Sequence, residues 1–371
     1  MPMKKKPTNI CCFLPDEIVE NILHRLPTKT LLKYKIVCKR WKSLISSTSF
    51  KRLHENKSLE NPVLILFSRQ EGKPFLTTVD LSGAVLDRWD LASIGLQNSA
   101  FLPSPFGSDN LLCLVVDMQR FFVCNPSTRR ACQICLPKAS MHCPSGISKA
   151  SFGYVPDRNQ YVIVAKFKGR RNWRMITLSR DDVVVSAGNI DERWKIIKDS
   201  ARYRVADGSP WGVFADGILY WTGDADDRRC LTCFDLWEEK FFVVLLPDEI
   251  VMIQEYQDDD QWLVELNGDL HLMYKKEGQQ DIELWKLDGA GDWGWSKQDM
   301  CVAGFRARFG AHFRPVMMDE KGEMLVYNGG FMEWYKLKHE VFRMGGKGYK
   351  NIHCHAEDVI LDFKLHIDTL L

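Results

Sequence analysis

Residues 14–50 read LPDEIVENILHRLPTKTLLKYKIVCKRWKSLISSTSF and combine helix-start signals with apolar stripes. Pro15 fits the first turn of a helix, where its missing N–H is not needed, and two carboxylates follow beside the positive end of the helix dipole. Apolar residues then recur at three- and four-residue spacing over residues 18–26, until Pro27 stops the helix. The stretch therefore predicts a first amphipathic helix with one face to bury.

Further short helices are expected after this one. Thr28 is placed to cap a second helix, whose apolar positions run from Leu31 to Val37. Residues 39–45 predict a third helix, and a final helical turn is expected at Phe50. About forty residues in three short helices are too few to close an independent core. We therefore expect some apolar surface to be left for another protein.

The pattern of residues 14–54 resembles the F-box of plant proteins. For that family the resemblance implies docking to a Skp-type adaptor on a cullin scaffold. The alternative is that the apolar residues only pack a small bundle, and the sequence does not divide Ile18, Ile22 and Leu44 between the two roles. The positions that match the adaptor-binding residues of the family are Leu14, Pro15, Ile22, Leu26, Pro27, Leu31, Leu32, Val37, Cys38 and Trp41.

The pattern changes after Asn61-Pro62, because proline disfavours helix in the residue before it. Short β-branched and aromatic runs follow, separated by Gly, Asp, Asn and Pro, which is typical of strands joined by turns. A turn signal followed by a hydrophobic pair recurs roughly every fifty residues, a kelch-like period. The recurrences begin at Asp109, Asp157, Asp216, Asn267 and Lys321.

A second signature, an alternating strand that ends in a turn, lies at residues 121–126, 231–236 and 282–288. A tight turn returning into another strand is how one blade of a propeller proceeds. About 310 residues at this period predict six four-stranded blades, with seven as the alternative. Residues 63–67 and the alternation over residues 359–365 are expected to pair in one blade and close the ring.

Residues 121–137, 152–157 and 213–221 are similar to the F-box-associated domain of plant F-box proteins. That family often has Asn-Gly-Leu where this chain has Asp109-Asn110-Leu111, a tolerable change because Asn accepts a positive φ. The resemblance implies a small N-terminal α-helical F-box followed by an all-β propeller. The expected divisions are a basic disordered tail at 1–10, the F-box at 11–56 and the propeller at 61–371.

Two cysteine pairs, Cys132 with Cys135 and Cys230 with Cys233, could supply the four thiolates of a structural zinc site. Both pairs lie in alternating strand patterns, where residues three apart point to opposite faces. We therefore expect buried thiols and no bound metal. His353-Cys354-His355 places two imidazoles on one strand face without a third ligand, so no metal is expected there either.

Sequence signals for catalysis are missing. No Gly-rich phosphate loop, Gly-x-Ser-x-Gly elbow or His-Glu-x-x-His motif occurs, so we expect no catalytic residue, no enzyme activity and no cofactor. Arg170, Arg171 and Trp173 are candidates for contacting a bound target, because Arg and Trp are enriched at interface centres. The alternative for them is packing within a blade, which is the favoured role of Trp293 and Trp295.

The formal charge of +2, from 50 basic and 48 acidic residues, provides no long-range field that would gather nucleic acid or an anionic membrane. The longest apolar run, residues 241–246, is far shorter than the ~20 residues that span a bilayer. Twelve cysteines without a secretory signal indicate a reducing compartment and free thiols. We expect a soluble protein of the cytoplasm or nucleus, with no nucleic-acid or membrane partner.

Together, the two resemblances imply the substrate-recognition subunit of a Skp/cullin/F-box ubiquitin ligase. Such a subunit brings a target protein near a ubiquitin-charged enzyme and makes no bond itself. The alternative is a propeller scaffold that docks the adaptor without leading to ubiquitylation. The loops of a propeller set its specificity, so the strand-and-turn period does not define which target is bound.

Overall fold

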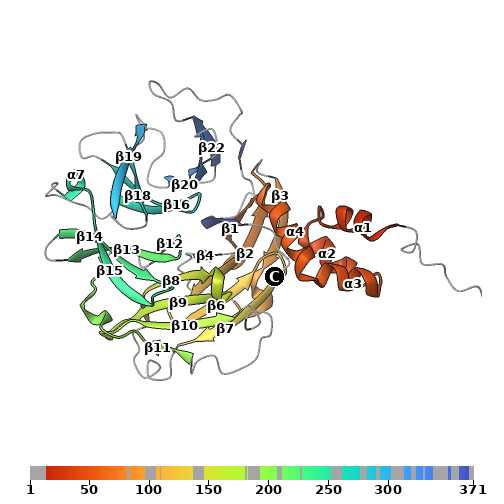
Figure 1. Ribbon diagram of the computed structural model, residues 1–371, viewed down its shortest axis with the longest axis horizontal. Coiled ribbons are helices and arrows are strands. Elements are labelled where there is room, and N and C mark those ends of the chain that lie inside the picture. Colours follow the sequence, from red (N-terminus) through yellow and green to blue (C-terminus); the bar gives the residue numbers. More distant parts are fainter. Residues whose placement is uncertain are drawn as a thin grey trace, which may run out of the picture.

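The computed structural model of the chain shows a group of N-terminal helices beside a ring of β-sheets (Figure 1). None of the helices in the described part is long and apolar enough to cross a membrane. The structure describes residues 14–81, 84–96, 106–108, 110–136, 146–179, 182, 193–206, 211–225, 228–251, 261–275, 282–289, 293–301, 313–318, 323–328, 331–336, 350–351 and 359–366.

The helix boundaries follow from local chemistry. Pro15 and Pro27 precede the first two helices with ψ angles of 150° and 145°, so the chain enters each helix from an extended residue. Side-chain caps begin the other two, because Cys38 Sγ and Ser47 Oγ each accept a hydrogen bond from the backbone N–H three residues on. The helices are α1 (Asp16–Leu23), α2 (Thr28–Tyr34), α3 (Lys39–Ser46) and α4 (Thr48–Leu59).

Two helical details differ from expectation. Thr28 is the first residue of α2, and Pro27 is its N-cap, so Thr28 does not cap the helix. The final turn expected at Phe50 is a helix of 12 residues. It extends because both Phe50 and His54, one turn later, are buried, and His54 Nε2 lies 2.9 Å from the Leu26 carbonyl oxygen.

Six four-stranded antiparallel sheets follow the helices within the described residues. One strand of each sheet contacts the corresponding strand of the next sheet, and the series returns to its start. These strands are, in order, β24 (Val359–His366), β4 (Phe106–Ser108), β8 (Ile147–Val155), β12 (Val213–Ala215), β16 (Gln261–Leu266) and β20 (Phe313–Met318). The chain is therefore an N-terminal group of helices followed by an all-β propeller. In its first three sheets the strands are β24 (Val359–His366), β1 (Val63–Gln70), β2 (Lys73–Val79) and β3 (Val85–Asp90); β4 (Phe106–Ser108), β5 (Leu111–Val116), β6 (Arg120–Asn125) and β7 (Arg130–Cys135); and β8 (Ile147–Val155), β9 (Gln160–Phe167), β10 (Arg174–Ser179) and β11 (Lys195–Ile196).

The other three sheets continue the ring, and short helical segments occur between some strands. These sheets contain β12 (Val213–Ala215), β13 (Ile218–Ala225), β14 (Arg228–Asp235) and β15 (Lys240–Leu245); β16 (Gln261–Leu266), β17 (Asp269–Lys275), β18 (Ile282–Asp288) and β19 (Gly294–Cys301); and β20 (Phe313–Met318), β21 (Glu323–Asn328), β22 (Phe331–Lys336) and β23 (Lys350–Asn351). The short segments are the 3-10 helices Leu91–Ile94, Pro156–Arg158 and Ser200–Arg202 and the α-helix α7 (Asp248–Val251).

The last strand closes the ring onto the first. β24 pairs antiparallel with β1, with Leu64 opposite Leu365 and Leu66 opposite Phe363. β1 therefore lies between β24 and β2, and neither of its edges is unpaired. The predicted pairing of residues 63–67 with residues 359–365 is confirmed.

The recurring turn signals form tight hairpins. Asp216 and Gly217 have φ angles of 43° and 76°, and Asn267 and Gly268 have 57° and 90°. Two successive positive φ angles define the type I′ turn, whose twist suits antiparallel strands. Asn110 has a φ of 67°, as expected for an Asn that replaces Gly at this position.

The cores lie between neighbouring sheets. Every residue of β5 is buried: Leu111, Cys113 and Val115 belong to the cluster shared with β8 and β9. The alternate residues, such as Leu112 and Leu114, belong to the cluster shared with β1 and β2. Because both of its faces are covered, β5 appears in the sequence as one continuous apolar run.

Candidate functional site

The helical module has its own internal core. Val19 and Leu23 of α1 pack with Leu31 of α2, Ile45 of α3 and Phe50 of α4, and all five side chains are buried. Burying one such side chain contributes about 1.5–3 kcal/mol. This cluster therefore joins all four helices.

Other apolar side chains of the module face solvent. On α1, Ile18 and Ile22 are 45% and 52% exposed and lie one turn apart, on a different face from Val19 and Leu23. Leu14, just before α1, is 46% exposed. Three half-exposed apolar residues within one short segment indicate a surface that another protein covers.

A second exposed apolar pair lies between α2 and α3. Ile36 is 88% exposed and Val37 is 52% exposed. The sequence places them in the apolar stripe of the second helix, but α2 ends at Tyr34. The Ile36 and Val37 N–H groups each bond to the carbonyl three residues back, so the chain forms a tight turn and both side chains lie outside the helix.

The structure sorts the ten predicted contact residues by exposure. Leu31 is fully buried in the core, so its expected place on the contact surface is wrong. Ile18, Ile36 and Leu53 are exposed apolar residues that the sequence did not assign to the surface, and periodicity alone gives no signal for them. Of the other predicted residues, Leu14, Pro15, Ile22, Pro27 and Val37 are exposed, whereas Leu26, Leu32, Cys38 and Trp41 are half-buried.

Contacts from α3 hold the start of the module. Arg40 Nη2 donates a hydrogen bond to the Leu14 carbonyl oxygen at 3.2 Å. The ring of Trp41 packs against Tyr34, with 5.5 Å between ring centroids. The exposed Leu14 therefore has a fixed position beside α3, as a preorganised contact residue requires.

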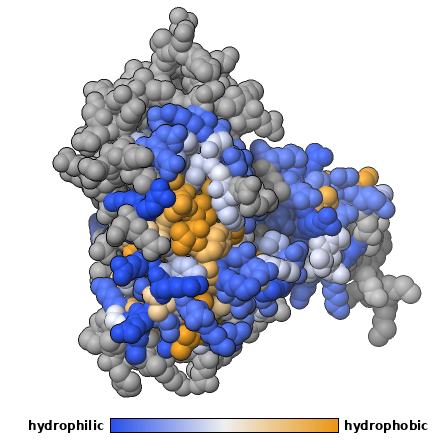
Figure 2. Space-filling view, turned by 60° about the vertical axis from the view of Figure 1, so that its left-hand side comes forward, coloured by the Kyte–Doolittle hydropathy of each residue, from blue (hydrophilic) through white to orange (hydrophobic). Residues whose placement is uncertain are grey.

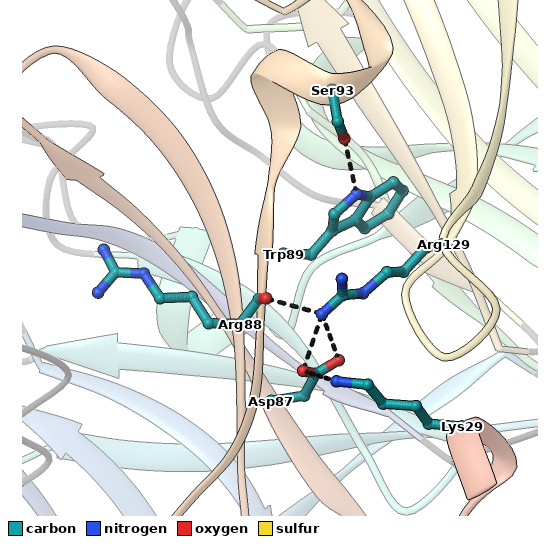
Figure 3. Close-up of polar contacts among 6 residues, drawn as sticks. All are labelled: Lys29, Asp87, Arg88, Trp89, Ser93 and Arg129. Carbon is teal, nitrogen blue, oxygen red and sulfur yellow. Dashed lines mark hydrogen bonds and ion pairs between the residues drawn. The ribbon is translucent and has the colours of Figure 1, made fainter.

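A charged cluster joins the helical module to the propeller (Figure 3). Lys29 Nζ of α2 lies 2.6 Å from Asp87 Oδ1 of β3. Arg129, in the turn between β6 and β7, donates to both oxygens of the same carboxylate at 2.8 and 3.0 Å, and to the Arg88 carbonyl oxygen at 2.8 Å. Asp87 thus connects the helices to two adjacent sheets.

The electrostatics of this cluster favour the charged form of Asp87. Burial alone would raise the pKa of this carboxyl group, but hydrogen bonds from Lys29 and Arg129 outweigh burial, and the pKa lies below its ordinary value. The neighbouring Trp89 is buried and donates its indole N–H to Ser93 Oγ at 3.1 Å, which fixes the end of β3.

A second contact crosses the same junction. Asn110, in the turn just before β5, donates from Nδ2 to Glu55 Oε1 of α4 at 3.1 Å. The adjacent His54 contacts the Leu26 carbonyl oxygen between α1 and α2. Since α4 also continues into β1 through residues 60–62, the helices are held to the propeller at three places.

The candidate target-contacting residues fall into two groups. Trp173 is fully buried, and its ring centroid lies 4.9 Å from that of Trp221 and 5.3 Å from that of Phe241. The prediction that Trp173 contacts a target is therefore wrong, because Trp173 belongs to the core between two sheets. Arg170 and Arg171 are exposed in the connection between β9 and β10.

The propeller also exposes apolar side chains that the sequence did not single out. Val243 and Leu245 of β15 are 38% and 50% exposed. Hydrophobic side chains also gather on the side of the propeller that Figure 2 presents.

The two tryptophans near β19 differ in exposure. Trp295 packs against a buried cluster, and its indole N–H donates to the Leu245 carbonyl oxygen at 2.8 Å. Trp293 contacts Phe242 and is partly exposed.

The cysteine pairs lie in two separate parts of the ring. Cys132 is buried in the cluster between the second and third sheets, and Cys135 of the same strand is half-buried. Cys230 and Cys233 are both buried, and burial raises the pKa of the Cys230 thiol to about 11. Within the part of the chain that the structure describes, no group of three or more His, Cys, Asp or Glu residues could hold a metal. His353, Cys354 and His355 lie outside the described residues.

Two family descriptions match the chain. "F-box associated beta propeller domain" matches residues 93–356, and "F-box domain" matches residues 12–53. Several Arabidopsis thaliana proteins are similar over most of the chain. F-box protein At5g65850 is 25% identical over 299 residues, which cover 76% of this chain and 70% of the relative. F-box protein At1g53790 is 24% identical over 318 residues, which cover 78% of this chain and 65% of the relative.

The chain spans 50% of the length of F-box protein At1g67130 and 74% of the length of F-box protein At1g30790, two further Arabidopsis relatives. Solved structures share only a general likeness. One is a nidogen/laminin complex, 10% identical, with a TM-score of 0.42, covering 82% of this chain and 99% of that chain. Another is a luciferin-regenerating enzyme, 15% identical, with a TM-score of 0.37, covering 65% of this chain and 72% of that chain. Likeness at this level carries no information about function.

Proposed function

We propose that this chain, which belongs to the family of F-box proteins with an F-box associated β-propeller domain, is the substrate-recognition subunit of a Skp/cullin/F-box ubiquitin ligase. The observation that carries the proposal is the exposed apolar surface on the helical module. Leu14, Ile18, Ile22 and Val37 remain exposed although the module has a buried core of its own. Bringing a target near a ubiquitin-charged enzyme is catalysis by proximity, so no reactive side chain is needed in this chain.

The two parts divide the work. The F-box binds a Skp-type adaptor, and through it a cullin scaffold, by covering the exposed apolar residues. The propeller recruits the target protein, and we infer that its six sheets are the six blades of one ring. The contacts of Asp87 and Glu55 support a fixed orientation between the two parts. We further propose that the ubiquitylated target is degraded, and that this occurs in the cytoplasm or the nucleus.

The adaptor surface is tested by changing Leu14 and Pro15 to alanine together. Truncating an anchor at the centre of a desolvated interface typically costs ~2 kcal/mol or more. Two such losses weaken adaptor binding by roughly a thousandfold, at about 1.4 kcal/mol per tenfold. The measurement is the Kd for a purified Skp-type adaptor, by calorimetry on the full chain.

A matched control is Leu245→Ala on β15, because Leu245 is 50% exposed and Leu14 is 46% exposed. Adaptor binding is expected to be unchanged in this variant. Undiminished binding by the folded Leu14→Ala/Pro15→Ala protein would show that these residues only pack the module, and the ligase proposal would lose its main support.

The alternative is a propeller scaffold that docks the adaptor without ubiquitylation. Proteins captured by proximity labelling with an F-box-deleted chain give candidate targets. A ligase target accumulates when this chain is depleted and is ubiquitylated in a reaction reconstituted with adaptor, cullin and charged enzyme. Captured proteins that neither accumulate nor become ubiquitylated would favour the scaffold.

A further inference from the structure

The nearly neutral total charge hides a strong local separation of charge. Residues 21–54 contain nine lysine and arginine residues and no aspartate or glutamate. With +9 in this segment and +2 in the whole chain, the rest of the chain carries −7. A segment of one sign on an otherwise acidic chain is a feature of interaction surfaces.

Three of these cations flank the exposed apolar pair Ile36 and Val37 along the chain. Lys33, in the last turn of α2, precedes the pair and is exposed. Lys39, the first residue of α3, follows it and is also exposed. Lys35 is half-buried in the same turn. The surface therefore has an apolar centre with lysines on both sides.

Like charges also lie close together where the module meets the propeller. Burial lowers the pKa of Lys35, and the neighbouring cations Lys51, Arg130 and Lys42 lower it further. These four groups come from the turn after α2, from α3, from α4 and from β7, so the fold brings them together. Their mutual repulsion destabilises the free protein and is relieved when an anionic surface covers them.

The chemistry of the surface favours a protein partner. Nucleic-acid surfaces usually pair cations with aromatic rings that stack on bases. Here the aromatic side chains of the segment are half-buried or buried, and Tyr34 packs against Trp41. The face of the helical module that Figure 2 shows is mostly hydrophilic, with isolated hydrophobic positions. Separate apolar anchors surrounded by charge fit a protein face that has apolar pockets and a charged rim.

We propose that the basic and apolar surface of residues 21–54 binds an acidic face of the adaptor, and that its lysines steer the adaptor during association. The inference rests on the proposed function, in which the adaptor covers Val37 and its neighbours. Charges at the rim of an interface mainly set the association rate constant and its salt dependence. The F-box thereby prefers the adaptor whose apolar pockets are bordered by the most carboxylates.

The test measures association of the full chain with a purified Skp-type adaptor by stopped flow, at ionic strengths from about 0.05 M to about 0.5 M. The variant is Lys33→Glu with Lys39→Glu. Lys33 lies at the C-terminal end of α2 and Lys39 at the N-terminal end of α3, so their effects on the helix dipoles oppose each other and the fold is preserved. The control, Lys195→Glu with Lys198→Glu, makes the same change in net charge at exposed positions of the propeller.

The unmodified chain is expected to associate at least tenfold more slowly at high salt than at low salt. The Lys33/Lys39 variant is expected to lose at least tenfold in association rate at low salt, with little change in the dissociation rate, and to show a weaker salt dependence. The neutral variant Lys33→Gln with Lys39→Gln is expected to lie between the two. The control is expected to behave like the unmodified chain.

Adaptor binding with a salt-independent rate, or equal rates for the Lys33/Lys39 variant and its control, would overturn this inference and leave the proposed function in place. Failure of the adaptor to bind at any salt concentration would overturn both. Binding of a DNA duplex or of phosphatidylserine vesicles that the Lys33/Lys39 variant alone loses would assign the surface to another class of partner and also overturn the inference.

Discussion

Replacing Asp87 by asparagine removes the charge that joins α2 to the propeller and keeps the size of the side chain. In the native protein Lys29 Nζ lies 2.6 Å from Asp87 Oδ1. Arg129 retains its bond to the Arg88 carbonyl oxygen in the variant, so the two sheets stay connected. The substitution therefore acts mainly on the attachment of the helical module.

The magnitude follows from the exposure of the groups. The side chains of Asp87 and Lys29 are 25% and 52% exposed. A hydrogen bond to a charged group contributes about 1.5–3 kcal/mol when buried, and an exposed ion pair contributes about 0.2–1 kcal/mol. We expect a loss near the top of the exposed range, about 1 kcal/mol.

The assay is hydrogen exchange of the amides of α1–α4 in the full chain. A small module can open as a unit while the rest of the protein stays folded, and contacts at the junction add to its opening free energy. At 1.36 kcal/mol per tenfold, a loss of about 1 kcal/mol accelerates exchange about fivefold. Exchange of β13 and β14 amides is expected to be unchanged.

The pH dependence gives a second readout. The pKa of Asp87 lies below its ordinary value in the folded protein, so its stabilising contribution is complete above the ordinary pKa of about 3.9 and is lost as pH falls through the folded value. The difference between the native chain and Asp87→Asn is therefore expected to stay constant from about pH 7 to about pH 5 and to disappear well below about pH 4.

The matched control is Asp117→Asn, which breaks an ion pair of 2.9 Å with Arg120 in a turn of the propeller. It is expected to leave exchange in the helices unchanged. Equal exchange of the helical amides in the native chain and in Asp87→Asn at neutral pH would show that Asp87 does not hold the helical module to the propeller. So would a difference that persists after Asp87 is protonated.

Three further predictions concern the propeller. Deleting residues from Val359 onward removes β24 and leaves one edge of β1 unpaired. The truncated chain is therefore expected to aggregate on size-exclusion chromatography, and a folded monomer would contradict the role of this pairing. Trp173→Ala is expected to lower the free energy of unfolding by about 3–5 kcal/mol in a urea titration, because the substitution leaves a cavity between two aromatic rings. A loss below about 1 kcal/mol would contradict the placement of Trp173 in the core. Metal analysis of the purified chain is expected to find much less than one zinc per chain. A content of about one zinc per chain that is lost when Cys132, Cys135, Cys230 and Cys233 are changed to serine would contradict the strand-alternation argument.

Local chemistry determined the positions of many elements. Pro15 and Pro27 mark where α1 and α2 begin because proline restricts the backbone on both sides of the peptide bond. Asp216-Gly217 and Asn267-Gly268 form hairpin turns because these residues accept positive φ angles at low cost. Such preferences act over a few residues and are therefore visible in the sequence alone.

Exposure was predicted less well, because it depends on residues that are distant in the sequence. Leu31 and Ile36 belong to the same apolar stripe in the sequence, yet the first is buried and the second is 88% exposed. The difference arises because α2 ends at Tyr34 and the core is completed by side chains from three other helices. Trp173 is likewise of a residue type that is enriched at interfaces, but Trp221 and Phe241 from another sheet pack against it in the core.

The helical module, the strand-and-turn period and the resemblance to F-box proteins could be predicted from the sequence, because all three depend on spacing along the chain. The way in which the two parts are joined depends on contacts between distant residues and is visible only in the folded protein. Lys29, Asp87 and Arg129 are separated by 58 and 42 residues and carry no shared motif. They meet because the first two sheets pack against each other, which brings β3 beside the turn between β6 and β7, and because the shared core of the helices and the Glu55–Asn110 hydrogen bond hold the helical module at that junction.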